Sequence, residues 1–333
     1  MKNLSLAISL ALSTTPVFAD EFKSTGARYP AQGGDMVANA NDSFGLTVNP
    51  ANLLTHSNEF DVLEFAANLT HKPEMGTNND MLGGYKSFAN FIFGGSFESS
   101  TGTDSFEEFF SDPRQGIETS QNSIAAAFGN TVSADESLTY GVGVVYTWID
   151  IDDPENKNTV DESGVTGTAK VSYQSKFDLQ TNSLIFDITL GAAYSPEILT
   201  ELNEEQFSVK PQIARVGIST RFSHFNSSIP WDITLSGEHL SYKFTAQSLM
   251  PIEYEKESRV GLEWTLIRPL GTDGDFSIRA GMSTFDSVQQ DHHLSAGFGY
   301  TSGNWSLDIS TSEHGVDRSD RSYNLSVSYT FID

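Results

Sequence analysis

The sequence predicts an all-β fold: a transmembrane antiparallel β-barrel of 12–14 strands with an N-terminal plug segment. Apolar residues recur at every second position over stretches of about ten residues, as in Leu138–Trp148 and Tyr323–Phe331, with aromatic residues near the ends. Only a closed barrel lets extended chain cross hydrocarbon with every backbone group hydrogen-bonded. A soluble β-sandwich would have to bury the alternating face, and the sequence supplies few helices to cover it.

The first nineteen residues have the pattern of a secretory signal peptide. Lys2 supplies the charge, Leu4–Leu12 the apolar stretch, and Val17-Phe18-Ala19 the cleavage pattern. The apolar stretch is far shorter than the roughly 20 residues that a membrane-spanning helix needs. We therefore expect cleavage before Asp20 and export to the outer membrane of a Gram-negative bacterium.

Composition excludes several functions. The chain has 44 acidic residues against 19 Lys and Arg, a formal net charge of −25, which repels nucleic-acid phosphates and argues against direct binding of DNA or RNA. It contains no cysteine, which excludes disulfides, thiolate catalysis, cysteine-ligated metals and lipoprotein attachment.

Thirteen segments have strand-like alternation. Bacterial single-chain barrels have an even number of strands, so one strand is missing from this set. It is expected before residue 90 or around Phe207–Lys210. The thirteen segments lie near residues 60–69, 87–97, 121–130, 138–149, 166–176, 182–194, 211–222, 231–240, 257–267, 275–284, 291–300, 304–311 and 321–332.

The connections differ in length between the two ends of the expected barrel. If the last strand ends in the periplasm, Thr301–Asn304 and Arg268–Gly274 are periplasmic turns. The long connections then lie outside the cell: 98–120, 150–165, 195–210, 241–256 and 312–320.

Two of these outer loops have helical signals. Asp104–Glu107 fits a capping box, with Phe106, Phe109 and Phe110 on one face. These three phenylalanines are candidate ligand contacts at the outer rim of the barrel. The alternative is that they simply pack onto that rim. In the other loop, Ser195-Pro196-Glu197 predicts a helix start, and its apolar stripe would be Ile198, Leu199 and Leu202.

Alternation also separates a lumen face from a lipid face. Charges of both signs point inward, which indicates a lumen linked by ion pairs rather than an open water channel. Polar interiors occur in any such barrel, so this feature does not identify a cargo. The expected lumen charge network is Arg215, Arg221, Glu238, Glu263, Arg279 and Asp308.

Residues 26–54 differ from the strands. Gly33-Gly34, Asn41-Asp42 and Asn49-Pro50-Ala51 form a compact, turn-rich unit. Pro50 fixes φ, and Asn49 can hydrogen-bond its own backbone, so together they predict a rigid turn. These seven residues are the candidate plug or gating residues, with simple turn formation as the alternative.

At this point the chain resembles the outer-membrane long-chain fatty-acid transporters, the FadL-like superfamily. In that family, a similar segment follows the signal peptide. It contains a glycine pair, a Val-Ala pair, an acidic residue and an Asn-Pro-Ala motif. The variant here most resembles the branch of the plasmid conjugative-transfer protein TraF. The resemblance continues in the last strands, as in Arg259–Trp264 and Ala296–Tyr300, and covers residues 26–54 and about 205–331. It implies a plug at 20–58 inside a fourteen-stranded barrel at 59–333.

No residue pattern indicates an enzyme, a cofactor or a metal site. The acidic residues at 150–162 are dense enough to bind Ca²⁺ or bridge lipopolysaccharide, but they match no defined calcium loop, and a solvated loop is favoured. His292 and His293 are adjacent on a strand and point to opposite faces. There is no Gly-x-Ser-x-Gly motif.

By resemblance, the expected function is passive transport of a hydrophobic or amphipathic small molecule. The ligand would bind at the outer rim, and the plug around Asn49-Pro50-Ala51 would shift to let it pass. The alternatives are a non-transporting envelope component of a conjugation or secretion apparatus, with assembly partners, and a plain structural barrel. Outer-membrane lipid and lipopolysaccharide are the expected surroundings. A transporter should have an apolar pocket between plug and wall, ideally with a break in the wall, whereas an assembly component should have a sealed lumen.

Overall fold

The computed structural model describes fifteen stretches of the chain. They are residues 27–34, 37–54, 62–73, 77–88, 90–102, 118–132, 137–153, 158–179, 182–202, 205–225, 229–245, 247–248, 256–286, 291–314 and 320–332. Within these stretches no helix combines the length and the apolar character needed to cross a membrane.

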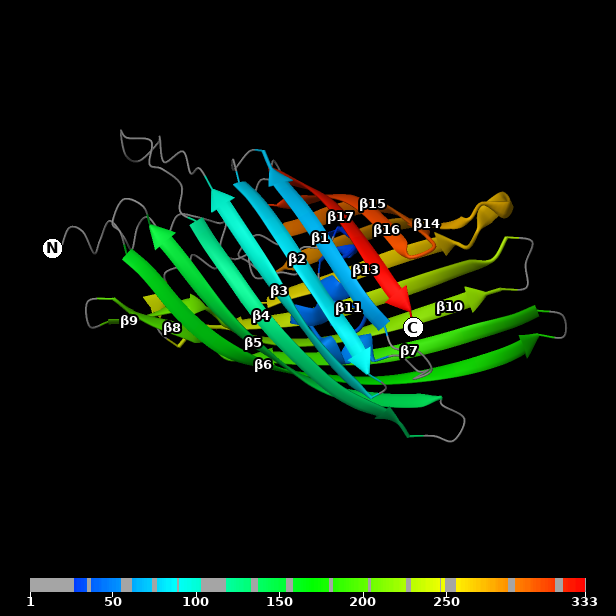
Figure 1. The fold of residues 1–333 in the computed structure, drawn as a ribbon, viewed down its shortest axis with the longest axis horizontal. Coiled ribbons are helices and arrows are strands. Elements are labelled where there is room, and N and C mark those ends of the chain that lie inside the picture. The colour runs from blue at the N-terminus through cyan, green and yellow to red at the C-terminus, as the bar shows by residue number, and fades with distance from the viewer. Residues whose placement is uncertain are drawn as a thin grey trace.

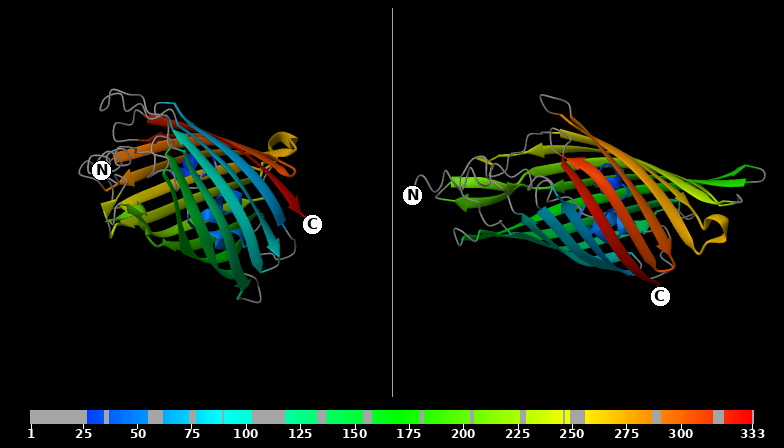
Figure 2. Two further views of the ribbon diagram at one scale, coloured as in Figure 1. Left: turned by 60° about the vertical axis from the view of Figure 1, so that its left-hand side comes forward. Right: turned by 90° about the horizontal axis from the view of Figure 1, so that it is seen from above.

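Fourteen antiparallel strands form a closed barrel, and the first strand pairs with both the second and the last. The prediction of a barrel of 12–14 strands is confirmed (Figures 1 and 2). The barrel strands are β1 (Val62–Lys72), β2 (Thr77–Phe88), β3 (Phe91–Gly102), β4 (Glu118–Thr131), β5 (Leu138–Asp153), β6 (Asn158–Leu179), β7 (Asn182–Ser195), β10 (Gln212–His224), β11 (Trp231–Lys243), β13 (Lys256–Leu266), β14 (Gly274–Phe285), β15 (Asp291–Ser302), β16 (Trp305–His314) and β17 (Asp320–Ile332).

The strand missing from the sequence prediction is β2, before residue 90 as expected. It begins with the polar run Thr77–Asp80, and Gly83-Gly84 interrupts its apolar alternation, so its pattern is weak. The second expected position, Phe207–Lys210, is also extended. It belongs to β9 (Glu205–Lys210), which pairs outside the barrel with β8 (Ile198–Leu202) and β12 (Gln247–Ser248).

The helix predicted after Ser195 is wrong. Residues Ile198–Leu202 form strand β8, which pairs with β9. Ile198 is buried against β6, where a Cβ added at Gly164 would lie 2.8 Å from its Cγ1. Pairing and this tertiary contact override the local helical signal. The other predicted helix, at 104–110, lies outside the described residues, and so do Phe106, Phe109 and Phe110.

The outer loop predicted at 150–165 is wrong in its extent. Strand β5 continues to Asp153 and β6 starts at Asn158, with Asp150 opposite Asp161. The acidic residues on either side of this connection are therefore in paired strands rather than in one loop. The loop predicted at 195–210 is likewise largely the β8–β9 hairpin.

The outer surface of the barrel is apolar. Val142 and Val144 on β5 and Val260 and Leu262 on β13 point outward and are exposed. A glycine separates the two residues of each pair. A soluble protein would bury this many apolar side chains, whereas a lipid bilayer solvates them. The chain is therefore an outer-membrane type of barrel.

The connections on the end of the barrel where the C-terminus lies are short (Figure 1). Only Gly303 and Asn304 join β15 to β16, and Arg268–Gly274 falls at the same end. That this end faces the periplasm remains a prediction.

Candidate functional site: the plug and the lumen wall

Residues 27–34 and 37–54, called the plug from here on, lie inside the barrel (blue in Figure 1). They contain three short 3₁₀ turns: η1 (Pro30–Gln32), η2 (Ser43–Thr47) and η3 (Pro50–Leu53). Proline opens η1 and η3, where its fixed φ suits the first turn. Most plug side chains are buried, and those of Tyr29 and Leu46 are fully buried.

The glycine pair ends η1 in a conformation that other residues rarely adopt. Gly33 has φ 89° and Gly34 has φ 123°. A Cβ at Gly33 would lie 2.9 Å from the Met282 carbonyl oxygen of β14, and one at Gly34 would lie 3.0 Å from the Arg259 guanidinium. Both positive φ and close approach to the wall therefore require glycine here.

Asn41 and Asp42 lie between η1 and η2 in the plug. Asp42 accepts the backbone N–H groups of Phe44 (3.0 Å) and Gly45 (3.2 Å), which caps η2. The Asn41 side-chain oxygen accepts a hydrogen bond from Arg28 at 2.7 Å. Burial raises the pKa of the Asp42 carboxyl above its ordinary value, although the nearby Arg28 guanidinium acts in the opposite direction.

Asn49 links the plug to the wall instead of capping its own turn, contrary to the sequence prediction. Its side chain makes no cap hydrogen bond at η3. Its Nδ2 atom instead donates to the Val37 carbonyl within the plug and to the Ala169 carbonyl of β6, each at 2.9 Å. Asn52 donates to the same Val37 carbonyl at 2.6 Å. Pro50 and Ala51 are buried in the turn that follows.

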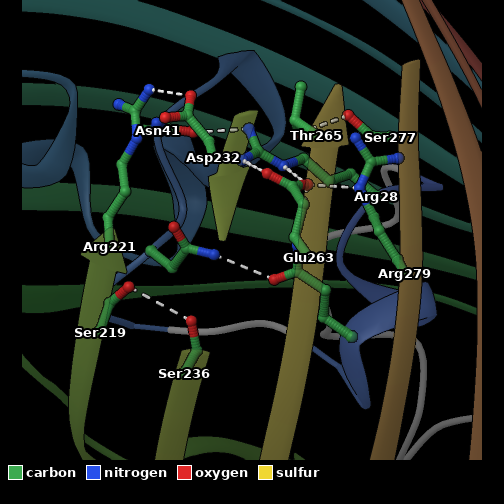
Figure 3. Close-up of polar contacts among 12 residues, drawn as sticks. Arg28, Asn41, Ser219, Arg221, Asp232, Ser236, Glu263, Thr265, Ser277 and Arg279 are labelled. Carbon is green, nitrogen blue, oxygen red and sulfur yellow. Dashed lines mark hydrogen bonds and ion pairs between the residues drawn. The ribbon is translucent and has the colours of Figure 1, made fainter. Parts of the chain in front are cut away.

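A cluster of ion pairs joins the other side of the plug to the wall (Figure 3). The Arg28 guanidinium donates to both carboxylate oxygens of Glu263 on β13, at 2.8 and 3.0 Å. Arg279 on β14 pairs with the same carboxylate and also with Asp308 on β16. Gln32 adds a hydrogen bond to Glu263 at 3.1 Å. Two positive and two negative groups balance inside the lumen.

The six residues expected in the lumen charge network fall into separate groups. Glu263, Arg279 and Asp308 belong to the cluster around Arg28. Arg221 pairs with Asp232, and Arg215 lines a small cavity beside the plug. Glu238 lies 3.9 Å from the Arg259 guanidinium, which is held by Glu257 at 2.6 and 2.7 Å.

Four charged residues of these groups were not predicted. Glu257 and Arg259 share the alternation phase of Glu263, and Asp232 shares that of Glu238, so the period-two pattern could have identified these three. Arg28 could not be found in this way, because it lies in the irregular plug and its partner is 235 residues away.

Pairs of opposed glycines in the wall also went unpredicted, and the plug contacts them closely. Gly129 faces Gly141 across β4 and β5, Gly191 faces Gly217 across β7 and β10, and Gly261 faces Gly281 across β13 and β14. An added Cβ would meet Leu54 at 2.5 Å at Gly129, Val37 at 2.2 Å at Gly191, and Gln32 at 2.0 Å at Gly281. At Gly191 and Gly281 the contact is with plug backbone, so no side chain fits there while the plug is in place.

The plug turns contact the wall along β1–β6 and β13–β16. A polar cavity beside the plug has a volume of about 20 Å³, room for about one water molecule. Thr47, Val48, Thr147, Ser195, Lys210 and Arg215 are among its lining residues. Across the described residues, every barrel strand pair runs without a shift in register. The described part of the chain therefore shows neither a break in the wall nor, in this cavity, room for an apolar ligand.

Comparison with known proteins gives similarity in structure only. No protein-family model matches the chain, and no curated protein matches it. The deltaS2 mutant of the TodX monoaromatic hydrocarbon channel is 12% identical with a TM-score of 0.51, covering 93% of this chain and 99% of that one. The CymD monoaromatic hydrocarbon channel is 14% identical with a TM-score of 0.50, covering 92% and 97%.

A third similar structure is the toluene transporter TodX of Pseudomonas putida, 14% identical with a TM-score of 0.49, covering 93% and 98%. At these identities the likeness of the first two structures shows the fold. It defines the class of protein: a fourteen-stranded outer-membrane β-barrel.

Proposed function

We propose that this protein is a passive outer-membrane channel for small hydrophobic or amphipathic molecules, and that the plug gates it. The observation that carries the proposal is a barrel whose lumen is filled by a segment of its own chain, held to the wall by ion pairs, hydrogen bonds and apolar packing. Non-covalent contacts of this kind can be released and remade, as a gate requires. Two barrels of the same fold are described as monoaromatic hydrocarbon channels.

The proposed gating residues are those whose contacts hold the plug in its closed position. Gly33 and Gly34 allow its close approach to β14, and Asn49 ties it to β6. The full set is Gly33, Gly34, Asn41, Asp42, Asn49, Pro50 and Ala51. The expected surroundings of the barrel are outer-membrane lipid and lipopolysaccharide.

A sealed lumen also fits the second candidate function, a barrel that transports nothing and serves an envelope assembly. A plug in the lumen is expected for both the gated channel and the assembly component. The two functions differ in what happens when the plug is removed or a hydrophobic compound is supplied. A gated channel should open, and an assembly component should gain no specific permeability to the compound.

The test has two parts. The full-length chain is produced in a host that lacks its own channels for hydrophobic compounds, and uptake of radiolabelled toluene and oleate is compared with the empty host. A variant lacking residues 27–54 is measured in planar bilayers, with heat-modifiable migration on gels as the folding control. We expect uptake above the host level and a higher single-channel conductance in the deletion. Uptake at the host level, with a correctly folded barrel, would refute the transport function.

A further inference from the structure

The plug contacts the wall through two halves of different chemistry. Its first part, residues 27–34, lies against β13–β16 and is held there by Arg28 and Gln32 through Glu263. Its second part, residues 43–54, lies against β1–β6 and packs there mainly with leucine side chains. We call these the polar half and the apolar half.

The wall under the apolar half is an apolar strip, unlike the rest of the lumen. Its members are Tyr85, Ile92, Gly94, Ala125, Ala127, Gly141, Gly143 and Val145, on β2 to β5. The register makes the strip continuous: Gly94 is opposite both Tyr85 and Ala125, and Ala127 is opposite both Ile92 and Gly143. On β13 to β17 the buried inward side chains are mostly Ser, Asn, Glu and Arg, as is usual for a barrel lumen, and Phe285 is apolar.

The plug covers this strip with side chains that resemble a hydrocarbon ligand. Leu46, Ala51, Leu53 and Leu54 form one buried cluster with the strip residues. Leu54 contacts the Gly129–Gly141 pair, Pro50 contacts Gly143, and Leu46 contacts Gly94. The small wall residues leave a shallow surface that accepts aliphatic groups from the plug.

We propose that the apolar strip is the binding track for a hydrophobic ligand, an acyl chain or an aromatic hydrocarbon, which replaces the plug leucines on it. The inference rests on the proposed transport function and adds where in the lumen the ligand binds and which half of the plug moves. A ligand shifts a conformational equilibrium only by its differential affinity for the two states. A hydrophobic molecule has such affinity for the apolar strip, where it exchanges one apolar contact for another.

The polar half stays in place during this exchange. Displacing it would separate Arg28 from Glu263 inside the lumen, and an apolar ligand offers no charge or hydrogen bond in return. Three ties of the apolar half to the wall are polar: Asn49 with the Ala169 carbonyl, Lys170 with the carbonyls of Asn52 and Leu54, and the Ser43 N–H with Glu64. None of these three ties joins two opposite charges, so displacing the apolar half does not break an ion pair such as Arg28–Glu263. The apolar half is therefore the half that a hydrocarbon displaces at the lower electrostatic cost.

Matched disulfide locks test this inference, and the absence of native cysteine makes them specific. Ala51→Cys with Gly141→Cys fixes the apolar half, since the Ala51 Cβ lies 3.1 Å from a Cβ built at Gly141. Ala31→Cys with Gly297→Cys fixes the polar half, where the corresponding distance is 2.5 Å. Both separations need to widen slightly to reach the roughly 3.5–4.5 Å of a disulfide. Each lock replaces one plug alanine and one wall glycine.

Uptake of radiolabelled toluene and oleate is measured for each double variant, oxidised and then reduced, with the four single variants as controls. Comparing one protein in two redox states removes differences in folding and expression. We expect the oxidised Ala51–Gly141 lock to lose uptake and to regain it on reduction, while the oxidised Ala31–Gly297 lock keeps it. Undiminished uptake with the oxidised apolar lock would overturn the inference, and so would loss of uptake with both locks. Absence of uptake in the unmodified chain would instead refute the transport function itself.

Discussion

Arg28 and Glu263 form a two-point ion pair although 235 residues separate them in the chain. Arg28 comes from the plug and Glu263 from strand β13, so this pair connects the two parts of the molecule directly (Figure 3). Glu263 also forms an ion pair with Arg279, the residue opposite it on β14. One carboxylate thus pairs with two guanidinium groups in the lumen, and much of the plug's polar attachment depends on it.

Replacing Glu263 with Gln should strongly destabilise the protein. Arg28 would lose its only carboxylate partner among the ion pairs described, and removing one member of a buried pair costs about 3–5 kcal/mol. The free energy of unfolding, measured by urea titration in detergent, reports the loss. Arg221→Gln is the matched control, because the Arg221 side chain is 47% exposed and its pair with Asp232 should contribute less than about 1 kcal/mol. Equal losses in both variants would show that the Glu263 cluster has no special role.

Gly281→Ala should displace the plug from β14. The new Cβ would lie 2.0 Å from the backbone of Gln32 and Gly33, too close for any side chain, so the plug backbone must move. We expect higher single-channel conductance in planar bilayers than for the unmodified protein. Gly167→Ala on β6 is the control, since a Cβ there meets nothing within 4 Å. A Gly281→Ala channel that conducts like the control would mean that the close contact does not hold the lumen shut.

Asn49→Ala should weaken the attachment of the plug to β6. The hydrogen bonds from Asn49 to the Val37 and Ala169 carbonyls would be lost, and each contributes about 0.5–1.5 kcal/mol. Urea unfolding measures the loss. Asn130→Ala serves as the comparison, because that exposed side chain accepts a hydrogen bond from the adjacent Thr131 N–H and its removal should change stability by less than about 0.5 kcal/mol. A negligible effect of Asn49→Ala would contradict the proposed role of Asn49.

Asp42 should make stability fall as pH rises. Burial raises the pKa of Asp42 above its ordinary 3.8, so the folded protein binds this proton more tightly than the unfolded chain. The contribution is fully present below pH 3.8 and is lost as pH rises through the raised pKa. Charged and titratable neighbours also contribute to the profile: Arg28, Tyr29, Glu64 and Asp308.

The comparison with Asp42→Asn isolates this effect. Asparagine keeps an acceptor for the cap of η2 but cannot ionise. The unfolding free energy of both proteins is measured from about pH 4 to pH 7. As the pH rises, the unmodified protein should lose stability relative to the asparagine variant. A difference that is constant over this range would refute the raised pKa.

The outward tryptophans should report the lipid boundary. Trp264 is 44% exposed and Trp305 is 57% exposed on the outer face, and the Trp305 ring packs edge-on against Tyr329 at 4.6 Å. Indole rings favour the membrane–water interface. Brominated lipids should therefore quench tryptophan fluorescence in reconstituted vesicles. Unquenched fluorescence would be incompatible with a barrel in the bilayer.

The sequence by itself determined the strands and their two faces. Side-chain direction alternates with a period of two whatever the rest of the fold does, so Val260 and Leu262 face lipid and Glu263 faces the lumen by local geometry alone. The same local rules placed turns at Gly33-Gly34, where glycine permits positive φ, and at Asn49-Pro50, where the proline ring holds φ near about −65°. In β2, Gly83-Gly84 interrupts the alternation, and the remaining pattern was too weak to predict the strand.

Only the tertiary structure decided which of these residues meet. The partner of Arg28 depends on strand order, register and the position of the plug, none of which is encoded within a few residues of either side chain. The same holds for Ile198, which lies in a strand because β9 and β6 are beside it. The wall glycines likewise look like ordinary strand residues until the plug is packed against them, because close approach is a property of two surfaces and not of one sequence.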